Sequence, residues 1–217
     1  MLNKITEKCP LFSGVELNQI KILLNCLDAK QHKYGKDEFI FQADEPALHV
    51  GIVLSGSANV IQEDFWGNRT ILTHVEPGEL FGEAFSCAGT EKLPVSVIAA
   101  EASEIMLIDY RKIVTVCSSA CAFHSRLIFN ILQTLANKNI TLTRKIEHVS
   151  QRTTRKKLLS FLSEQAMKAK NNKIIIPYNR QELADFLCVE RSALSRELAL
   201  MKKDGLLDYE KNRFVLM

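Results

Sequence analysis

The sequence predicts an α+β protein: an antiparallel β domain, then a long helix, then a small C-terminal module of short helices and a hairpin. Eight of the nine glycines precede residue 90, and the ninth is Gly205. Glycines between short apolar runs are typical of tight turns between strands, whereas the glycine-free stretch 90–204 favours helices. An apolar repeat of three and four residues ends at Val149, and a helix pair precedes the terminal hairpin.

The composition is that of an ordinary globular protein. With 217 residues, 47% hydrophobic and 24% charged, the chain can bury a core, which excludes a disordered or fibrous protein. No run approaches the roughly 18 apolar residues that span a bilayer. The first seven residues also lack the apolar segment of an export signal. We therefore predict a cytoplasmic protein without a membrane partner.

Residues 1–112 are predicted to form the β domain. Its candidate strands are runs rich in β-branched and aromatic residues, at 39–41, 49–60, 70–75, 95–100 and 105–108. The turns Trp66-Gly67-Asn68 and Glu76-Pro77-Gly78-Glu79 lie between them, which favours an antiparallel β-roll or sandwich. A helix is expected before the strands, at 15–27, because apolar side chains recur there at helical spacing.

Residues 113–149 are predicted to form a dimerisation helix. In a heptad, the a positions are Leu132, Asn139 and Ile146, and the d positions are Ile128, Leu135, Leu142 and Val149. One asparagine at an a position selects register and two strands at a cost in stability, so the seam predicts a homodimer. A second row, Phe123, Leu127 and Ile131, suits packing within the chain. The alternative is that the whole stripe packs against its own domain.

Residues 150–217 are predicted to form a helix-turn-helix with a wing. After the basic joint 151–157, a helix carries Leu158, Leu159, Phe161 and Leu162 on its apolar face, and a short strand follows at 174–176. Asn179, with Glu182 three residues later, predicts the cap of the first helix of the pair. The second helix, at about 191–203, turns Leu194, Leu198 and Met201 inward, and the strands 206–210 and 213–217 form the wing.

The charge distribution points to a polyanionic partner for this C-terminal module. Residues 141–217 hold 16 basic and nine acidic side chains, whereas residues 1–140 hold 12 and 16. We predict that the module binds double-stranded DNA through these residues: Arg191, Ser192, Ser195, Arg196, Lys202, Lys203, Lys211 and Arg213. The second helix would enter the major groove, where an arginine can donate two hydrogen bonds to guanine. The alternative is a solvated helix face that happens to be basic.

Four motifs, in this order and spacing, give the whole chain a resemblance to a known family. They are Cys9-Pro10-Leu11-Phe12-Ser13-Gly14, Val53-Leu54-Ser55-Gly56, Pro77-Gly78-Glu79-Leu80-Phe81-Gly82-Glu83 and Arg191-Ser192-Ala193-Leu194-Ser195-Arg196-Glu197-Leu198. With them the chain resembles the Crp/Fnr family, that of the cyclic-AMP receptor protein and the fumarate-nitrate regulator. The resemblance implies a homodimeric transcription regulator with a roll like a cyclic-nucleotide-binding domain, a winged helix-turn-helix and RNA polymerase as a partner.

The sequence departs from that family at the effector pocket, for which the resemblance implies Gly82, Glu83, Pro94, Val95 and Ser96. In members that bind cyclic AMP, an Arg-Ser pair about ten residues after Gly-Glu neutralises the phosphate. Here Leu93-Pro94-Val95-Ser96 stands at that place, and a buried phosphate without a counter-charge is costly. We therefore expect an unknown small-molecule effector rather than cyclic AMP, unless a shifted loop brings Lys92 to the phosphate.

The recognition helix departs from the family as well. Where many members carry a glutamate that accepts a hydrogen bond from cytosine, this sequence has Ser192. The operator preferred by those members is therefore not assumed for this chain.

The remaining alternatives concern cysteines and catalysis. Cys117, Cys121 and His124 recur at helical spacing, which leaves open a metal, haem or thiol redox sensor beside simple packing. An iron–sulfur cluster of the family type needs several N-terminal cysteines, whereas Cys9 stands alone in that stretch, so we do not expect such a cluster. No catalytic motif appears and the five histidines are dispersed, so we predict a protein that is not an enzyme. A cyclic-nucleotide-binding regulatory module whose winged helix binds protein rather than DNA stays open as an alternative function.

Overall fold

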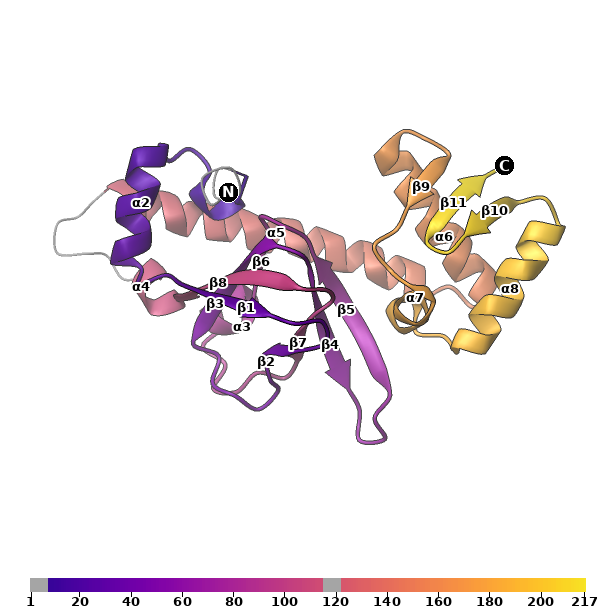
Figure 1. Ribbon diagram of the computed structural model, residues 1–217, viewed down its shortest axis with the longest axis horizontal. Coiled ribbons are helices and arrows are strands. Elements are labelled where there is room, and N and C mark those ends of the chain that lie inside the picture. The colour runs from indigo at the N-terminus through magenta and orange to yellow at the C-terminus, as the bar shows by residue number, and fades with distance from the viewer. Residues whose placement is uncertain (1–7, 115–121) are drawn as a thin grey trace. The chain divides into compact units, whose positions relative to one another are not determined.

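The computed structural model describes residues 8–114 and 122–217, with the side chains of 122–124 and Val114 not described. The chain forms two compact units. The first extends to Gly67 and continues with Leu72–Asn139, and the second holds Asn68–Ile71 and Ile140–Met217. The long helix α5 (Ala122–Val149) begins in the first unit and ends in the second (Figure 1).

The predicted β-roll is made of two four-stranded sheets and belongs to the first unit, apart from residues 69–71 of one edge strand (Figure 1). One sheet has the order β1 (Lys30–Tyr34), β8 (Ser103–Asp109), β3 (His49–Ser55) and β6 (Leu80–Phe81). The other has the order β2 (Phe39–Phe41), β7 (Ser96–Ala99), β4 (Ala58–Glu63) and β5 (Arg69–Val75). The pairings of β8 with β1 and β3, and of β7 with β2 and β4, are antiparallel, which confirms the predicted fold class.

The run 49–60, predicted as one strand, forms two. β3 ends at Ser55 and β4 begins at Ala58. Gly56, at φ +74°, makes the turn, and a Cβ on it would lie 2.3 Å from the hydroxyl oxygen of Ser103. A left-handed backbone in so close a space needs glycine. The polar strand β1, the two-residue β6 and the short helix α3 (Glu83–Cys87) also escaped prediction, because none shows a clear apolar period.

The core of the roll is closed by the N-terminal segment and α5. The 3₁₀ turn Pro10–Phe12 and α2 (Leu17–Cys26) pack with α5, whose Leu127 and Ile131 are buried. This agrees with the second apolar row, whose third member, Phe123, has a side chain outside the described ones. Asn130 on the same helix donates hydrogen bonds to the carbonyls of Leu11 at 2.8 Å and Ser13 at 2.9 Å. α5 is therefore part of the roll's core along one face.

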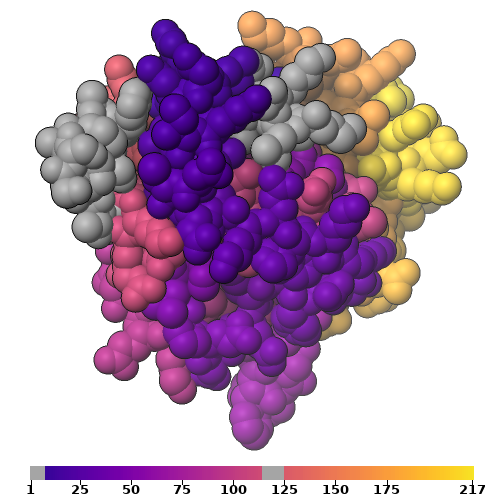
Figure 2. Space-filling model, turned by 60° about the vertical axis from the view of Figure 1, so that its left-hand side comes forward, coloured from indigo at the N-terminus to yellow at the C-terminus, as the bar shows by residue number. Residues whose placement is uncertain are grey.

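The hairpin between β4 and β5 projects from the roll (Figure 2). Its tip carries Phe65 and Trp66, two residues that are 94% and 82% exposed. The rings contact each other edge to face, with their centroids 5.8 Å apart. Gly67, at φ +79°, helps to form the turn.

The second unit is a small helical module with a three-stranded sheet. After α5 come α6 (Thr154–Ala169), β9 (Lys173–Ile175), α7 (Arg180–Leu187), α8 (Arg191–Lys203), β10 (Leu207–Glu210) and β11 (Arg213–Leu216). The sheet order is β10-β11-β9, as expected for a wing. In the part of the chain that the structure describes, no helix is long and apolar enough to cross a membrane.

The basic joint before this module is largely helical, which differs from the polar linker expected there. Thr153 caps α6, and its hydroxyl oxygen accepts a hydrogen bond from the Lys156 amide at 3.2 Å. The predicted apolar face is buried except for Leu159, which is 39% exposed. The buried His148, in the last turn of α5, bonds Ser160 at 2.7 Å and Glu164 at 2.6 Å, so side-chain contacts join α5 to α6.

Candidate nucleic-acid interface and effector pocket

The predicted helix pair is built by local capping and by one lysine from α6. The Asn179 side chain accepts hydrogen bonds from the amides of Gln181 and Glu182, which confirms the predicted cap of α7. At the other end, Cys188 lies at φ +52° and makes the turn. The Lys157 ammonium donates to the carbonyl of Leu187 at 3.1 Å and to that of Cys188 at 3.2 Å. A cation at a helix C-terminus stabilises the carbonyls that lack partners there.

The second helix of the pair, α8, is held in the module by its core and by an arginine. Its predicted inner residues Leu194, Leu198 and Met201 are fully buried. On its flank, the Arg155 guanidinium contacts Glu197 at 2.5 Å and Asp204 at 2.8 Å. Because Arg155 lies on α6, these two ion pairs fix the orientation of α8 within the second unit.

The outer face of α8 presents the predicted base-contacting residues together. Arg191, Ser192, Ser195 and Arg196 are all exposed. The first turn of this helix contains no acidic residue, and the side chain of Glu190 makes no cap. A helix N-terminus is stabilised by negative charge, so Arg191 at this end does not serve helix stability. The face suits a polyanion placed against the start of the helix.

The two lysines at the end of α8 differ in their contacts. The Lys202 ammonium lies 2.5 Å from the Asp208 carboxylate and 5.8 Å from the centre of the Tyr209 ring. The hydrogen bond to Asp208 raises the pKa of Lys202, which stays charged. Lys203 is exposed on the neighbouring position. Lys202 therefore helps to hold the hairpin to α8 as well as adding charge to the surface.

The hairpin of β10 and β11 is held at its turn by α7. Lys211, at φ +54°, forms the turn with Asn212. The Arg180 guanidinium lies 5.0 Å from the Tyr209 ring centre and donates to the Lys211 carbonyl at 3.2 Å. Burial lowers the pKa of Arg180. The side chains of Lys211 and Arg213 remain exposed, so the turn presents two cations on a fixed backbone.

Much of the apolar seam of α5 is exposed in the part of the chain that the structure describes. Leu132 is 60% exposed and Ile146 is 63% exposed, and Asn139 and Leu142 are exposed as well. The buried residues of α5 lie instead on its other face, and they include Leu127, Asn130 and Ile131. Of the d positions, Leu135 packs in part against the core of the roll. The apolar a positions therefore do not have the packing that the alternative interpretation required.

The residues expected at the effector pocket differ in their surroundings. Pro94 is exposed, Val95 belongs to the hydrophobic core, and the Ser96 hydroxyl accepts a hydrogen bond from the Ala43 amide at 2.9 Å. Gly82, at φ +81°, packs against Phe41, and the Glu83 carboxylate pairs with Lys138 of α5 at 2.7 Å. Lys138 gave no signal in the sequence that could have placed it there.

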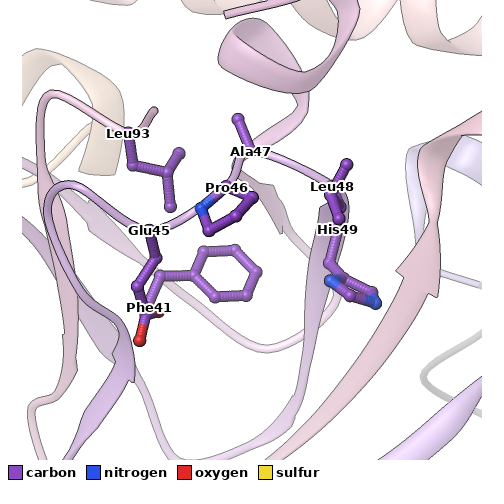
Figure 3. Close-up of a pocket in the computed structure, with 7 residues that line it drawn as sticks. All are labelled: Phe41, Glu45, Pro46, Ala47, Leu48, His49 and Leu93. Carbon is purple, nitrogen blue, oxygen red and sulfur yellow. The ribbon is translucent and has the colours of Figure 1, made fainter. Parts of the chain in front are cut away.

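A surface pocket of about 250 Å³ is lined in part by Leu93, the residue before Pro94 (Figure 3). Its wall is mainly apolar, and it is lined by Phe41, Glu45, Pro46, Ala47, Leu48, His49 and Leu93. Ligand pockets usually hold about 300–1,000 Å³, so this one is small. The carboxylate of Glu45 would repel a phosphate. The pocket therefore does not replace the missing phosphate site.

The cysteines that the structure describes do not form a metal site. Cys117 and Cys121 lie outside the described residues, and the side chain of His124 is not described either. Among the described residues, no group of three or more histidine, cysteine or acidic side chains is placed to hold a metal. Cys9, Cys26, Cys87 and Cys188 are free thiols. Burial raises the pKa of Cys9 to about 12, so this thiol is unreactive at neutral pH.

Comparison with known proteins agrees with this architecture. Residues 31–120 match the model of the cyclic nucleotide-binding domain, and residues 156–217 match the Crp-like helix-turn-helix domain. No curated protein matched the chain.

Solved structures with the same fold share little sequence with the chain. The c-di-GMP responsive global regulator CLP of Xanthomonas campestris has a TM-score of 0.77 at 21% identity, covering 93% of this chain and 99% of that one. FixK2 of Bradyrhizobium japonicum has a TM-score of 0.69 at 21% identity, covering 87% and 92%. A CRP-family transcriptional regulator of Thermus thermophilus has a TM-score of 0.63 at 18% identity, covering 85% and 91%.

The order of the two matched domains is that of the roll and the helix-turn-helix in the structure. The β-roll, the long α5 and the braced helix pair with its wing account for nearly the whole described chain. The protein belongs to the Crp/Fnr family of transcription regulators.

Proposed function

We propose that the protein is a homodimeric regulator that binds an inverted-repeat operator through α8. The observation that carries this proposal is that Arg191, Ser192, Ser195 and Arg196 are all exposed on one helix. The ion pairs of Arg155 with Glu197 and Asp204 hold this helix in the module. Such a helix fits the major groove, where arginine and serine side chains contact base edges. The exposed Lys203, Lys211 and Arg213 would contact phosphates. Its place of action is then the cytoplasm, with RNA polymerase as the partner that the resemblance implies.

The uncovered seam of α5 supports the homodimer. Two helices paired through Leu132, Asn139 and Ile146 are related by a two-fold axis, so the two α8 helices would face related half-sites. Centres about one turn of DNA apart, roughly 34 Å, are typical of such dimers. The operator should therefore be palindromic.

The experiment is selection of binding sites from a random duplex library by the purified full-length protein. We expect the selected sequences to share an inverted repeat with half-sites about 10 base pairs apart. Binding should weaken steeply with added salt, because phosphate contacts release counterions. Binding with no sequence preference, or no binding to duplex at low salt, would exclude the proposed function and favour a module that acts through protein contacts.

The effector is proposed to be a small molecule other than cyclic AMP. The phosphate of a cyclic nucleotide needs a cation, and the residues at the expected place are the exposed Pro94 and the core residue Val95. The Ser96 hydroxyl oxygen already accepts a hydrogen bond from the Ala43 amide, and the Glu83 carboxylate is paired with the Lys138 ammonium. Binding would thus have to break existing contacts and bury a phosphate.

Isothermal titration calorimetry with cyclic AMP tests this prediction. We expect no saturable heat up to millimolar nucleotide, where the binding free energy is only about −4 kcal/mol. A dissociation constant below about 10 μM would contradict it. In that case the variant Lys92→Ala shows whether Lys92 supplies the missing charge, since it lies next to Leu93 and is exposed.

A further inference from the structure

One ammonium group of α5 holds the loop between β6 and α3. The Lys138 Nζ lies 2.7 Å from Glu83 Oε1 and donates a hydrogen bond to the Leu80 carbonyl at 2.5 Å. Glu83 is 1% exposed, whereas the Lys138 side chain is one-third exposed. The contact joins the end of β6 and the start of α3 to the helix that carries the seam. All the residues in this contact belong to the first unit.

The carboxylate depends on this lysine. Its second oxygen, Oε2, is buried and has no hydrogen-bond partner among the described residues. A buried carboxylate without a partner is strongly unfavourable, so loss of the Lys138 contact favours a movement of the loop or of the helix that gives the carboxylate another partner. The ion pair therefore defines two states of this region, one with the Glu83–Lys138 contact formed and one with it broken.

The loop itself has little freedom to absorb such a movement. A Cβ on Gly82 would lie 2.9 Å from the Phe41 ring and 3.0 Å from the His49 carbonyl oxygen. The buried Ser86 hydroxyl, in α3, donates to that same carbonyl at 3.1 Å. The backbone around Glu83 is thus packed on the roll. A change in the Glu83–Lys138 contact passes more readily to α5 than to the loop.

Lys138 lies directly beside the seam. In the heptad it precedes Asn139 at the a position, and it lies between the d positions Leu135 and Leu142. Holding Lys138 against the roll limits the motion of this part of α5 before any partner helix binds. A helix that is already ordered loses less conformational entropy when it pairs.

We infer that the Lys138–Glu83 ion pair is an internal clamp that couples the loop 80–83 to the dimer seam of α5. With the clamp closed, the middle of α5 is preorganised for pairing; with it open, the seam is less ordered and the dimer is weaker. The clamp rests on the proposed function, because the dimer is what delivers two α8 helices to DNA. Through the clamp, a change in the roll would alter dimerisation and thereby the binding of DNA by the two α8 helices.

The test is the double variant Glu83→Met/Lys138→Met, which removes both charges and keeps similar volumes. Replacing both members of an ion pair by apolar side chains of similar volume often leaves stability unchanged, so this protein should fold. We expect its amides at 135–142 to exchange hydrogen about tenfold faster, and its dimer dissociation constant to rise about tenfold, the usual range for coupling between sites. Hydrogen exchange followed by mass spectrometry and sedimentation equilibrium give these two values.

Two variants serve as controls. Lys112→Met breaks an exposed pair with Asp28, at 3.4 Å in the same unit, and should change neither value. Lys138→Arg keeps the charge and should leave both values as they are in the wild-type protein. Exchange rates and a dimer constant within twofold of wild type in the double variant would overturn the clamp and leave a structural ion pair. Failure of the wild-type protein to bind duplex DNA would instead overturn the proposed function, because exchange does not depend on DNA.

Discussion

The double variant Leu132→Asp/Ile146→Asp is expected to be a monomer at concentrations where the wild-type protein is a dimer. Both side chains are mostly exposed in the single chain, so the monomer should lose little stability. In the dimer they would be buried, and burying each apolar side chain contributes about 1.5–3 kcal/mol. The dimer dissociation constant should rise at least about 100-fold, and operator affinity should fall with it. Sedimentation equilibrium and fluorescence anisotropy with operator DNA measure the two effects.

Two further variants make this result specific to the seam. Asn139→Leu should tighten association and broaden the choice of register or oligomer, because the polar a position costs stability and gives specificity. Ile22→Asp changes a side chain that is 65% exposed on α2 and should leave the dimer intact. If the double aspartate variant still dimerises with the wild-type constant, the protein associates through another surface.

The second large effect is expected from Arg196→Ala. Arg196 is exposed on the outer face of α8, and its buried neighbours lie on the opposite side of the helix. If its guanidinium donates two hydrogen bonds to a guanine, its loss should cost about 1–3 kcal/mol of binding free energy. The preference should relax at one symmetric pair of positions in the operator. Repeated site selection with the variant measures this loss of preference.

Lys203→Ala is the matched control for that experiment. It lies on the same helix, and a phosphate contact at this place should weaken binding to all sequences alike and reduce the salt slope by about one. Lys202 is a poorer control, because its ion pair with Asp208 holds the hairpin. If Arg196→Ala selects the same sequences as wild type, base recognition belongs to Arg191, Ser192 and Ser195.

The sequence by itself determined the features that depend on local pattern. The cap at Asn179, the inner face of α8 and the two strands of the wing follow from residue type and spacing within one element, and the structure confirms them. The turn at Gly56 was missed because the apolar run continues through it. The exposed a positions of α5 could be predicted since periodicity separates two faces of one helix.

Tertiary structure alone decided which partners the charged side chains contact. The Lys138 ammonium meets the carbonyl of Leu80, 58 residues away, and the Arg155 guanidinium meets Glu197, 42 residues away. Contacts at such separations depend on how elements pack, and hydrophobic periodicity carries no information about polar partners on other elements. From the sequence, Arg180 is likewise only one basic residue among others, and its contact with the Tyr209 ring of the wing is known only from the structure. The sequence thus determined the elements and their buried faces, whereas packing decided the ion pairs that brace α8 and tie α5 to the roll.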